Sequence, residues 1–222
     1  MKFNIIVAKC NNNGIGINNT LPWNIPGDLK RFSKLTTGSG NNAIIMGKNT
    51  WLSLPKKPLP KRDNLILSTT LTSDNITTNN THIFNNINKC ISFCENKYDT
   101  IWVIGGYQIY NTFIKKNLID ELYITHINAD FECDTFFPEI YDGYLKIKND
   151  KIWCKKYNTN YYYQLYKKIK INEYYFYNNL KNDTKKVCRI VSINTTKKKY
   201  IYTIEIGSTK YNVYNENLFD YC

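Results

Sequence analysis

Short apolar runs rich in β-branched residues alternate with segments of helical spacing along most of this chain, and this alternation restricts the possible folds more than any other feature. The apolar runs are residues 3–9, 43–46, 65–68 and 100–104. The segments of helical spacing are residues 26–37, 47–52, 87–97 and 107–114. Residues 121–128 and 161–166 alternate as later strands. Strands that alternate with helices predict an α/β layer fold with a mainly parallel sheet.

The pattern changes after about residue 170. Short alternating segments follow one another, separated by polar turns at 195–198 and 207–208, and they predict strands at residues 187–193, 199–206, 210–214 and 216–219. We therefore expect a main domain at 1–170, a linker at 171–182 and a small all-β module at 183–222. A module of that size is marginal alone, so we expect it to pack on the main domain or on a partner.

Two phosphate-binding motifs are incomplete. Gly14 and Gly16 follow the first strand, but a dinucleotide fingerprint needs glycine at the position of Asn19. Gly47 and Lys48 begin a helix, but a P-loop needs glycine at the position of Asn42. Neither motif is therefore assigned.

Two strand-to-helix junctions remain as candidate anion sites. Residues 47–50 and 105–108 each place glycine before a helix, where free backbone N–H groups attract anions, and Lys48 adds a positive charge. Such junctions lie on the same rim of a parallel sheet, so a ligand with several phosphates could bridge them. The alternative is that these glycines only close tight turns.

Taken together, six segments resemble the dihydrofolate reductase family in order and spacing, across residues 3 to about 168. They are Gly14–Gly16, Leu21–Leu29, Ile45–Trp51, Pro58–Arg62, Val103–Gly106 and Asp134–Pro138. The resemblance implies a three-layer fold whose central sheet is mixed and mainly parallel. It also implies NADPH-dependent reduction of 7,8-dihydrofolate to tetrahydrofolate in one-carbon metabolism. Folate and antifolate-type molecules are the ligands it implies.

Asp28 is the key residue that the resemblance implies. The family's acid hydrogen-bonds the pterin edge here and promotes protonation of N5 through water. Burial beside apolar neighbours should raise the pKa of this carboxyl group, while the helix N-terminus opposes that shift. The alternative is an ordinary helix cap. Trp23 and Thr125 would position the water and the acid, Leu21 would lie on a mobile loop over the nicotinamide, and Tyr110 would lie near hydride transfer.

The resemblance also implies the ligand-binding residues. An apolar slot with one cation would hold the substrate, with Arg62 pairing with the glutamate α-carboxylate: Ile6, Ala8, Asp28, Leu29, Phe32, Leu54, Leu59, Arg62, Ile104 and Thr125. Lys48 would select NADPH over NADH. The cofactor would contact Ala8, Ile15, Gly16, Leu21, Gly47, Lys48, Asn49, Thr50, Leu67, Ser68, Thr69, Ile104, Gly105, Gly106, Tyr107, Gln108, Ile109 and Tyr110.

Three residues depart from the family pattern. Lys61 stands where the family commonly has glycine, which predicts a reshaped turn. Tyr107 and Gln108 replace a third small residue and, in some members, a basic one. Cofactor selectivity would then depend more on Lys48.

The net charge of +12 has three interpretations: a nucleic-acid surface, polyanionic ligands, or AT-rich coding that favours Lys and Asn. A protein that kept the reductase fold but binds nucleic acid or another partner is the alternative function. Seven cysteines without a CxxC pair, and two widely separated histidines, predict free thiols in a cytoplasmic protein without a zinc site. No apolar stretch is long enough to predict a membrane span.

The resemblance to dihydrofolate reductase does not cover the last 52 or so residues. Their short-strand pattern resembles an SH3-like small barrel, a module that binds peptides or nucleic acid. The alternative is a docked extension that only stabilises the enzyme. The segment is too short to be a thymidylate synthase, to which some reductase domains of this family are fused.

Overall fold

The computed structural model describes residues 1–72, 78–140, 143–179, 184–195, 200–214 and 218–220. These residues form two compact units, and the chain crosses between them more than once. The first unit holds residues 1–138 and 150–163, and the second holds 139–149 and 164–222. Among the described residues, no helix is both long and apolar enough to cross a membrane.

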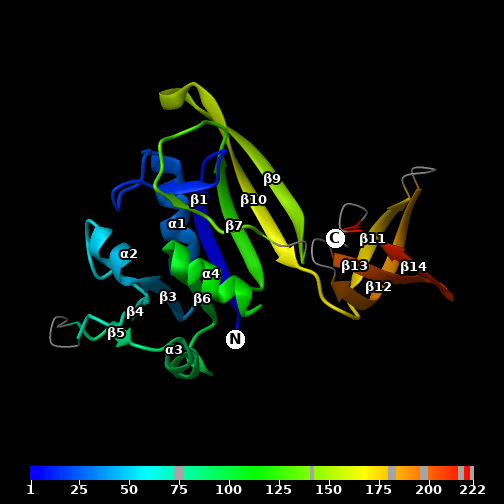
Figure 1. Ribbon diagram of the computed structural model, residues 1–222, viewed down its shortest axis with the longest axis horizontal. Coiled ribbons are helices and arrows are strands. Elements are labelled where there is room, and N and C mark those ends of the chain that lie inside the picture. The colour runs from blue at the N-terminus through cyan, green and yellow to red at the C-terminus, as the bar shows by residue number, and fades with distance from the viewer. Residues whose placement is uncertain (73–77, 141–142, 180–183, 196–199, 215–217, 221–222) are drawn as a thin grey trace. The chain divides into compact units, whose positions relative to one another are not determined.

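An eight-stranded sheet has the order β5-β4-β3-β6-β1-β7-β10-β9 (Figure 1). Its strands are β1 (Phe3–Lys9), β3 (Asn42–Gly47), β4 (Asp63–Leu67), β5 (Thr81–Phe84), β6 (Thr100–Gly105), β7 (Glu121–Ile127), β9 (Tyr144–Cys154) and β10 (Thr159–Lys168). Every pairing from β5 across to β7 is parallel. Two short strands, β2 (Gly14–Gly16) and β8 (Thr135–Phe136), pair with each other separately.

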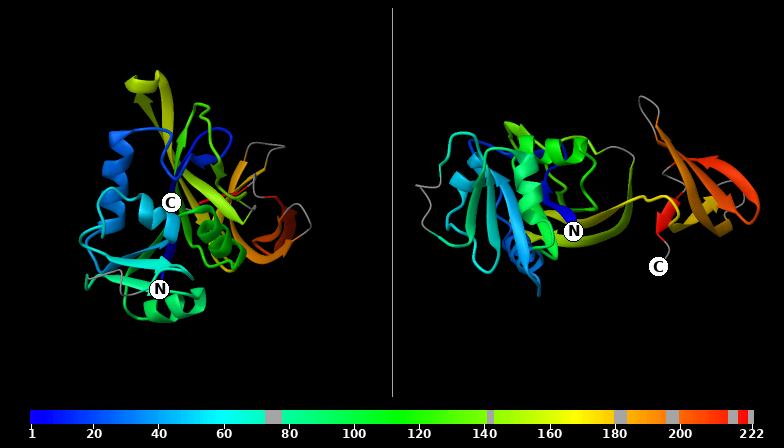
Figure 2. Two further views of the ribbon diagram at one scale, coloured as in Figure 1. Left: turned by 60° about the vertical axis from the view of Figure 1, so that its left-hand side comes forward. Right: turned by 90° about the horizontal axis from the view of Figure 1, so that it is seen from below.

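Helices cover both faces of the sheet in the first unit. They are α1 (Pro26–Thr37), α2 (Lys48–Ser53), α3 (Ile87–Cys94) and α4 (Tyr107–Lys115), and a 3-10 turn, Lys155–Tyr157, joins β9 to β10. Side chains of β1 alternate between faces: Ile6 packs in a cluster with Trp51 of α2 and Phe32 of α1, whereas Phe3 meets Phe113 of α4 with ring centroids 5.5 Å apart. Figure 2 shows α1 and α4 on opposite sides of the strands.

The sequence predictions for this part of the chain are confirmed for the fold class and for the longest elements, including β1, β6, α1 and α4. Two strands of the eight-stranded sheet were missed, as were the short β2 and β8. β5 is short and lies in an Asn- and Thr-rich stretch, and β9 alternates charged with apolar residues that gave no clear apolar run. β5 and β9 are the edge strands of this sheet, where exposed polar side chains weaken the sequence signal.

The second unit contains a five-stranded antiparallel sheet of order β14-β13-β12-β11-β15. Its strands are β11 (Tyr174–Asn179), β12 (Thr184–Thr195), β13 (Tyr200–Ile206), β14 (Thr209–Val213) and β15 (Leu218–Asp220). Four strands follow one another across the sheet, and the last returns to pair with the first. Gly207 forms the expected turn between β13 and β14 with a φ of 61°, whereas the turn expected around 196–198 lies outside the described residues.

The expected linker at 171–182 is wrong, because it contains β11, which pairs with two strands of this sheet. Polar Asn and Lys residues around its tyrosines concealed the strand. The units also do not divide at residue 170. Leu145 of β9 and Ile169, which follows β10, lie in the same buried cluster as Tyr175, Ile190 and Tyr202 of the sheet.

Candidate functional site

Asp28 lies in the first turn of α1 and faces β7. The hydroxyl of Thr125 donates a hydrogen bond to Asp28 Oδ1 at 2.5 Å. The helix begins after Ile25, whose side chain makes no capping hydrogen bond, and Asp28 is the acidic residue of its first turn. The carboxylate is aimed at the sheet rather than at the helix backbone.

Burial raises the pKa of the Asp28 carboxyl group above its usual value, and this effect exceeds two opposing influences. The Thr125 hydrogen bond and the positive charge of Arg31 both lower the pKa. A raised pKa keeps a larger share of this carboxyl group protonated as the pH approaches neutrality, which suits a group that takes part in proton transfer.

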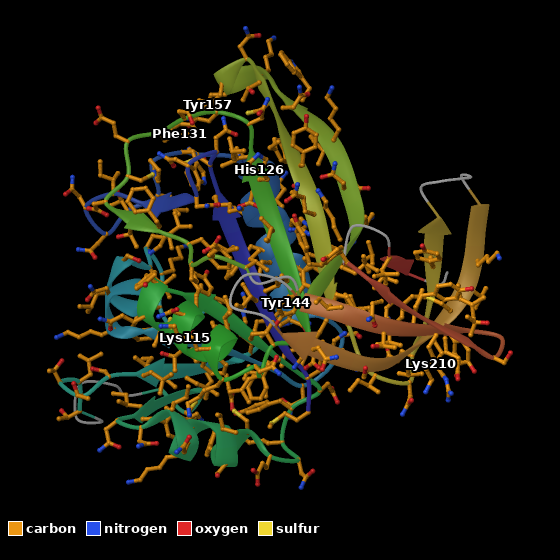
Figure 3. The ribbon with its side chains drawn as sticks, turned by 45° about the vertical axis from the view of Figure 1, so that its right-hand side comes forward. Lys115, His126, Phe131, Tyr144, Tyr157 and Lys210 are labelled. Carbon is orange, nitrogen blue, oxygen red and sulfur yellow. The ribbon has the colours of Figure 1, made fainter. Side chains whose placement is uncertain are left out.

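Trp23 packs in a second cluster beside this site, together with Ile25 of the segment before α1 and Ile127 of β7. Its ring meets Phe131 edge to face at 5.3 Å, and Phe131 in turn meets Tyr157 at 5.5 Å (Figure 3). Its buried indole Nε1 has no hydrogen-bond partner among the described residues. A buried donor without a partner is costly unless a water or a ligand accepts its hydrogen bond, so the position fits the expected water-holding role.

An apolar cluster contains five of the residues expected to line the substrate slot. Ile6 is one of its buried members, and the partly buried side chains packed against the cluster include Phe32, Leu54, Leu59 and Ile104. Leu29 is 52% exposed and does not belong to this cluster, and Ala8 packs instead in the cluster of Trp23. The slot residues therefore come from β1, α1 and β6 and from the segments after α2.

Arg62 is a buried cation, 7% exposed. Its guanidinium donates to Pro60 O at 3.0 Å and to the hydroxyl of Thr36, and lies 5.9 Å from the ring centroid of Phe32. In the part of the chain that the structure describes, no carboxylate lies within ion-pair distance of it. Burial lowers the pKa of this group. A buried guanidinium without a counter-ion is unfavourable by itself, and an anionic ligand would remove that cost.

The turn before Arg62 keeps the backbone geometry that glycine prefers. Lys61 has a φ of 61°, in the left-handed region that costs a non-glycine residue energy. Pro58 follows a cis peptide bond. The lysine therefore does not impose an ordinary right-handed or extended backbone at this position.

A pocket of about 470 Å³ joins the two strand-to-helix junctions. Its lining includes ten of the residues expected to contact the cofactor, namely Gly47, Lys48, Asn49, Thr50, Leu67, Ser68, Thr69, Gly106, Gln108 and Ile109. Neither α2 nor α4 has a side-chain cap on its first N–H groups. Lys48 Nζ donates to Thr70 Oγ1 at 2.8 Å. The pocket thus combines unpaired backbone donors, hydroxyl groups and a cation, as a phosphate-bearing ligand requires.

The junction after β6 is closely packed. Gly105 has a φ of 127°, which only glycine adopts readily, and a Cβ there would lie 3.3 Å from both Thr50 Oγ1 and Tyr110 Oη. The Gly105–Gly106 peptide bond is cis. The buried Tyr110 hydroxyl donates to Ile6 O at 3.0 Å. Tyr110 therefore joins α4 to β1.

Several expected cofactor residues do not line this pocket. Leu21 is 52% exposed, and Tyr107 is exposed at the start of α4. Ile15 and Gly16 belong to β2, which pairs with β8. Asp134 holds the following loop, because its carboxylate accepts from Asn18 N at 2.7 Å and its backbone N–H donates to Gly16 O.

Six residues near the site were missed from the sequence. Five line the pocket: Thr70, Phe84, Asn85, Ile87 and Thr112. Phe84 and Asn85 were missed because β5 itself was missed, and its carboxyl end meets the same rim as β3 and β4. The sixth is Arg31, whose position in α1 gave no signal for a functional residue.

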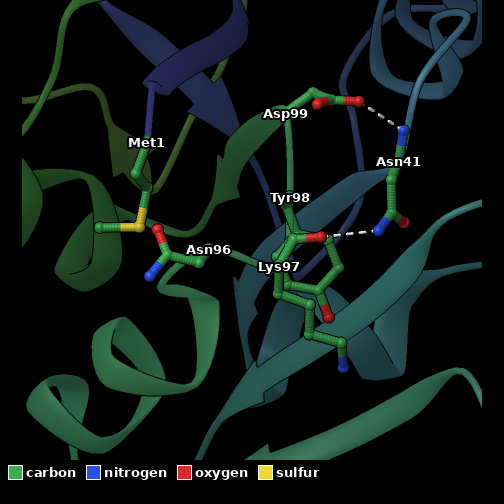
Figure 4. Close-up of a pocket in the computed structure, with 6 residues that line it drawn as sticks. All are labelled: Met1, Asn41, Asn96, Lys97, Tyr98 and Asp99. Carbon is green, nitrogen blue, oxygen red and sulfur yellow. Dashed lines mark hydrogen bonds between the residues drawn. The ribbon is translucent and has the colours of Figure 1, made fainter.

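A second pocket of about 340 Å³ lies near the N-terminus (Figure 4). Its polar groups bond to one another. Asn41 donates from its backbone to Asp99 Oδ2 at 2.8 Å and from its side chain to Lys97 O at 2.6 Å. These contacts tie the loop before β3 to the loop before β6, so we assign this pocket a structural role.

Comparison with known proteins gives a consistent result. Residues 2–168 match the family described as dihydrofolate reductase. The chain is 38% identical to a dihydrofolate reductase from Drosophila melanogaster over 158 residues, which cover 68% of this chain and 86% of that protein. It is 35% identical to one from Aedes albopictus over 183 residues, 76% of this chain and 98% of that protein. A viral dihydrofolate reductase from Saimiriine herpesvirus 2 is 40% identical over 148 residues, 62% and 68% of the two chains.

Proposed function

Because this chain belongs to the dihydrofolate reductase family and reduces dihydrofolate, we propose that it does so with NADPH at a site built around Asp28 and the pocket between its two strand-to-helix junctions. The observation that carries the proposal is the short hydrogen bond from Thr125 to a half-buried Asp28. The product, tetrahydrofolate, serves one-carbon metabolism. The alternative of a binding protein that only kept the fold is not adopted.

The reduction adds a hydride to C6 and a proton to N5 of the pterin. NADPH, when bound, would supply the hydride. Asp28 binds the polar edge of the pterin, and Thr125 holds the carboxylate in place. The indole Nε1 of Trp23, a buried donor without a partner among the described residues, holds the water through which the proton reaches N5. The apolar cluster around Ile6 and Phe32 excludes other water from the ring.

Arg62 binds the α-carboxylate of the substrate's glutamate tail. Its planar guanidinium can donate two parallel hydrogen bonds to a carboxylate, and a lysine ammonium cannot reproduce that geometry. We expect Arg62→Lys to weaken dihydrofolate binding by at least about tenfold, the loss of one charge-assisted hydrogen bond, and to leave NADPH binding unchanged. Fluorescence titration with each ligand measures both affinities.

The control for Arg62→Lys is Lys61→Asn, which removes a charge from the exposed neighbour and suits its left-handed backbone. It should change neither affinity. Equal losses for the two ligands in Arg62→Lys would contradict the assignment, because they would indicate a general loss of structure rather than of one carboxylate contact.

The cofactor pocket fits NADPH through its phosphates. Lys48, Ser68 and Thr69 line this pocket and would bind the adenosine 2′-phosphate, and the N-termini of α2 and α4, which have no side-chain caps, would bind the pyrophosphate. The sequence departures at Tyr107 and Gln108 add no positive charge here, so Lys48 is the pocket's cation. Its Nζ contact with Thr70 holds the side chain over the pocket.

The direct test is the oxidation of NADPH in the presence of dihydrofolate, followed by absorbance. We expect the native chain to turn over and to prefer NADPH over NADH. Lys48→Gln should lower kcat/KM for NADPH by about 10- to 100-fold, the value of one or two charge-assisted hydrogen bonds, with little effect on NADH. Absence of turnover by well-folded protein would refute the proposed reaction, and an equal loss with both cofactors would refute the role of Lys48.

Two further predictions from the sequence are not tested by the structure. One is the cytoplasmic location. The other is binding of a protein or a nucleic acid by the C-terminal module, whose strand order, with the last strand returning to the first, is compatible with the expected SH3-like barrel.

A further inference from the structure

Arg31 lies at the centre of the polar contacts around Asp28, three residues further along α1 and therefore on a neighbouring part of the helix surface. Its Nη1 donates to Thr125 Oγ1 at 3.4 Å, and the same hydroxyl donates to Asp28 Oδ1 at 2.5 Å. Since a hydroxyl has one proton, a donor on one side of the Thr125 oxygen favours the orientation in which its proton points to Asp28. The three groups form a directed chain from guanidinium to hydroxyl to carboxylate.

Aromatic rings hold the guanidinium in this position. Arg31 Cζ lies 4.2 Å from the ring centroid of Tyr163 in β10 and 5.9 Å from that of Tyr123 in β7. Tyr163 is itself held by Tyr161 at a centroid distance of 5.3 Å. A cation stacked on a ring in a partly desolvated place is held more firmly than an exposed arginine, so Arg31 is built into the site and is not a freely moving surface charge.

We propose that Arg31 is a positioning residue for the reduction: its guanidinium, stacked on Tyr163, directs the Thr125 hydroxyl towards Asp28 and thereby favours the ionised form of that carboxylate. This inference rests on the role proposed for Asp28. It explains how one carboxyl group can be partly buried and yet exchange its proton during turnover. Burial favours the protonated form of Asp28, whereas the chain of contacts from Arg31 through Thr125 favours its ionised form.

The other titratable groups around this chain come from four elements. Tyr110 of α4 lies within electrostatic range of Asp28, and Asp150 of β9 lies within range of Arg31. Tyr123 donates to Glu121 at 2.8 Å, and Glu121 pairs with Lys2. Burial raises the pKa of Tyr110, Tyr123 and Tyr163, so all three stay neutral throughout the range in which Asp28 titrates. Arg31 is therefore the cation that acts on Asp28 within this group.

The test is a carbon-13 NMR titration of the Asp28 carboxyl group in the ligand-free protein, with Asp28→Asn used to assign the signal. We expect Arg31→Gln to raise the pKa of Asp28, because the charge and the directed hydroxyl are both lost. Lys30→Gln is the matched control, since it removes the same charge from the exposed neighbouring position and should leave that pKa unchanged. Arg31→Lys keeps the charge and should restore part of the difference.

Activity provides the second measurement. The alkaline limb of kcat/KM for dihydrofolate against pH, which reports groups of the free enzyme, should move to higher pH in Arg31→Gln by the same shift that NMR reports. In a Thr125→Val background the Arg31→Gln shift should be smaller, because the hydroxyl that transmits part of the effect is absent. If Arg31→Gln does not fold, Tyr163→Leu removes the ring beneath the guanidinium and provides the same comparison.

An unchanged pKa of Asp28 in Arg31→Gln, or an equal change in Lys30→Gln, would overturn the inference. A pKa that rises in the NMR titration while the activity profile stays fixed would support the link between Arg31 and Asp28. That result would instead refute Asp28 as the group that titrates during turnover. The two measurements therefore separate a failure of this inference from a failure of the proposed function.

Discussion

Replacing Asp28 by asparagine is expected to lower kcat by about 10²–10⁴-fold at pH 7, the range that a positioned acid or base contributes to catalysis. Asparagine keeps the shape of the side chain and can still accept the hydrogen bond from Thr125. It cannot carry or release a proton. Rapid-mixing and steady-state assays with saturating NADPH measure the loss.

NADPH affinity should be unchanged in Asp28→Asn, because the pocket of Lys48 and Ser68 does not include Asp28. The difference in kcat between Asp28→Asn and the native protein should become smaller as the pH falls, since solvent can then protonate the substrate. Asp130→Asn, which removes the same charge from an exposed position, should have native activity. Near-native turnover by Asp28→Asn at pH 7 would rule out the proposed role.

The same substitution should make the protein more stable at neutral pH. Burial raises the pKa of Asp28 in the folded state above its usual value of 3.8, so ionisation of this group favours the unfolded state. The resulting loss in the free energy of unfolding is absent below pH 3.8. It grows as the pH rises from 3.8 to the pKa of Asp28 in the folded state, and it is constant above that pKa. Thermal unfolding should therefore show a higher Tm for Asp28→Asn at pH 7 and equal Tm values for the two proteins at pH 3. A lower Tm at pH 7 would indicate that the native charge is stabilised by its neighbours.

The parts of the fold predicted from sequence are those in which local pattern and tertiary environment agree. β1 and β6 are buried on both faces, so their continuous apolar runs identify them directly. β5, at one edge of the sheet, has no such run. Its absence from the prediction also removed Phe84 and Asn85 from the expected cofactor pocket.

The site residues also differ in whether local sequence pattern could identify them. Asp28 and Thr125 are 97 positions apart, and only the resemblance of whole segments to a family could associate them before the structure was known. Arg31 matches no family motif, and its spacing on α1 gave no signal for a functional residue. Its role depends on Thr125 and Tyr163, which reach it from β7 and β10. A contact between three distant segments leaves no mark in local periodicity.

The sequence prediction placed the boundary between the compact units at residue 170, which is wrong for a related reason. The family resemblance ends near residue 168, which suggested that the structure would divide there as well. However, Leu145 is 6% exposed and Ile169 is 4% exposed in the cluster that includes Cys188 and Val213 of the C-terminal sheet. Family membership follows sequence, whereas a compact unit follows buried contacts, and here part of the reductase hairpin completes the core of the extension.

Deleting residues 171–222 is therefore expected to lower the stability of what remains. The truncation uncovers Leu145, Ile147 and Ile169, and burial of one such side chain contributes about 1.5–3 kcal/mol. Loss of about 3–5 kcal/mol would lower the Tm by roughly 6–20 °C for a protein of this size. Turnover per folded molecule should stay close to native, because Asp28, Thr125 and the cofactor pocket all lie in the first unit.

A pair of point variants tests the same contact in the full chain, where no segment is missing. Leu145→Ala should destabilise the protein by about 2–5 kcal/mol, as expected for a buried leucine, whereas the exposed neighbour Lys146→Ala should change its stability by less than about 1 kcal/mol. Thermal and urea unfolding measure both. If the truncated chain melts with native Tm and Leu145→Ala resembles Lys146→Ala, the extension does not stabilise the reductase hairpin and a separate binding role becomes its explanation. If the truncated chain and Leu145→Ala both lose stability while they keep their turnover, the extension stabilises the fold of the enzyme and takes no part in its chemistry.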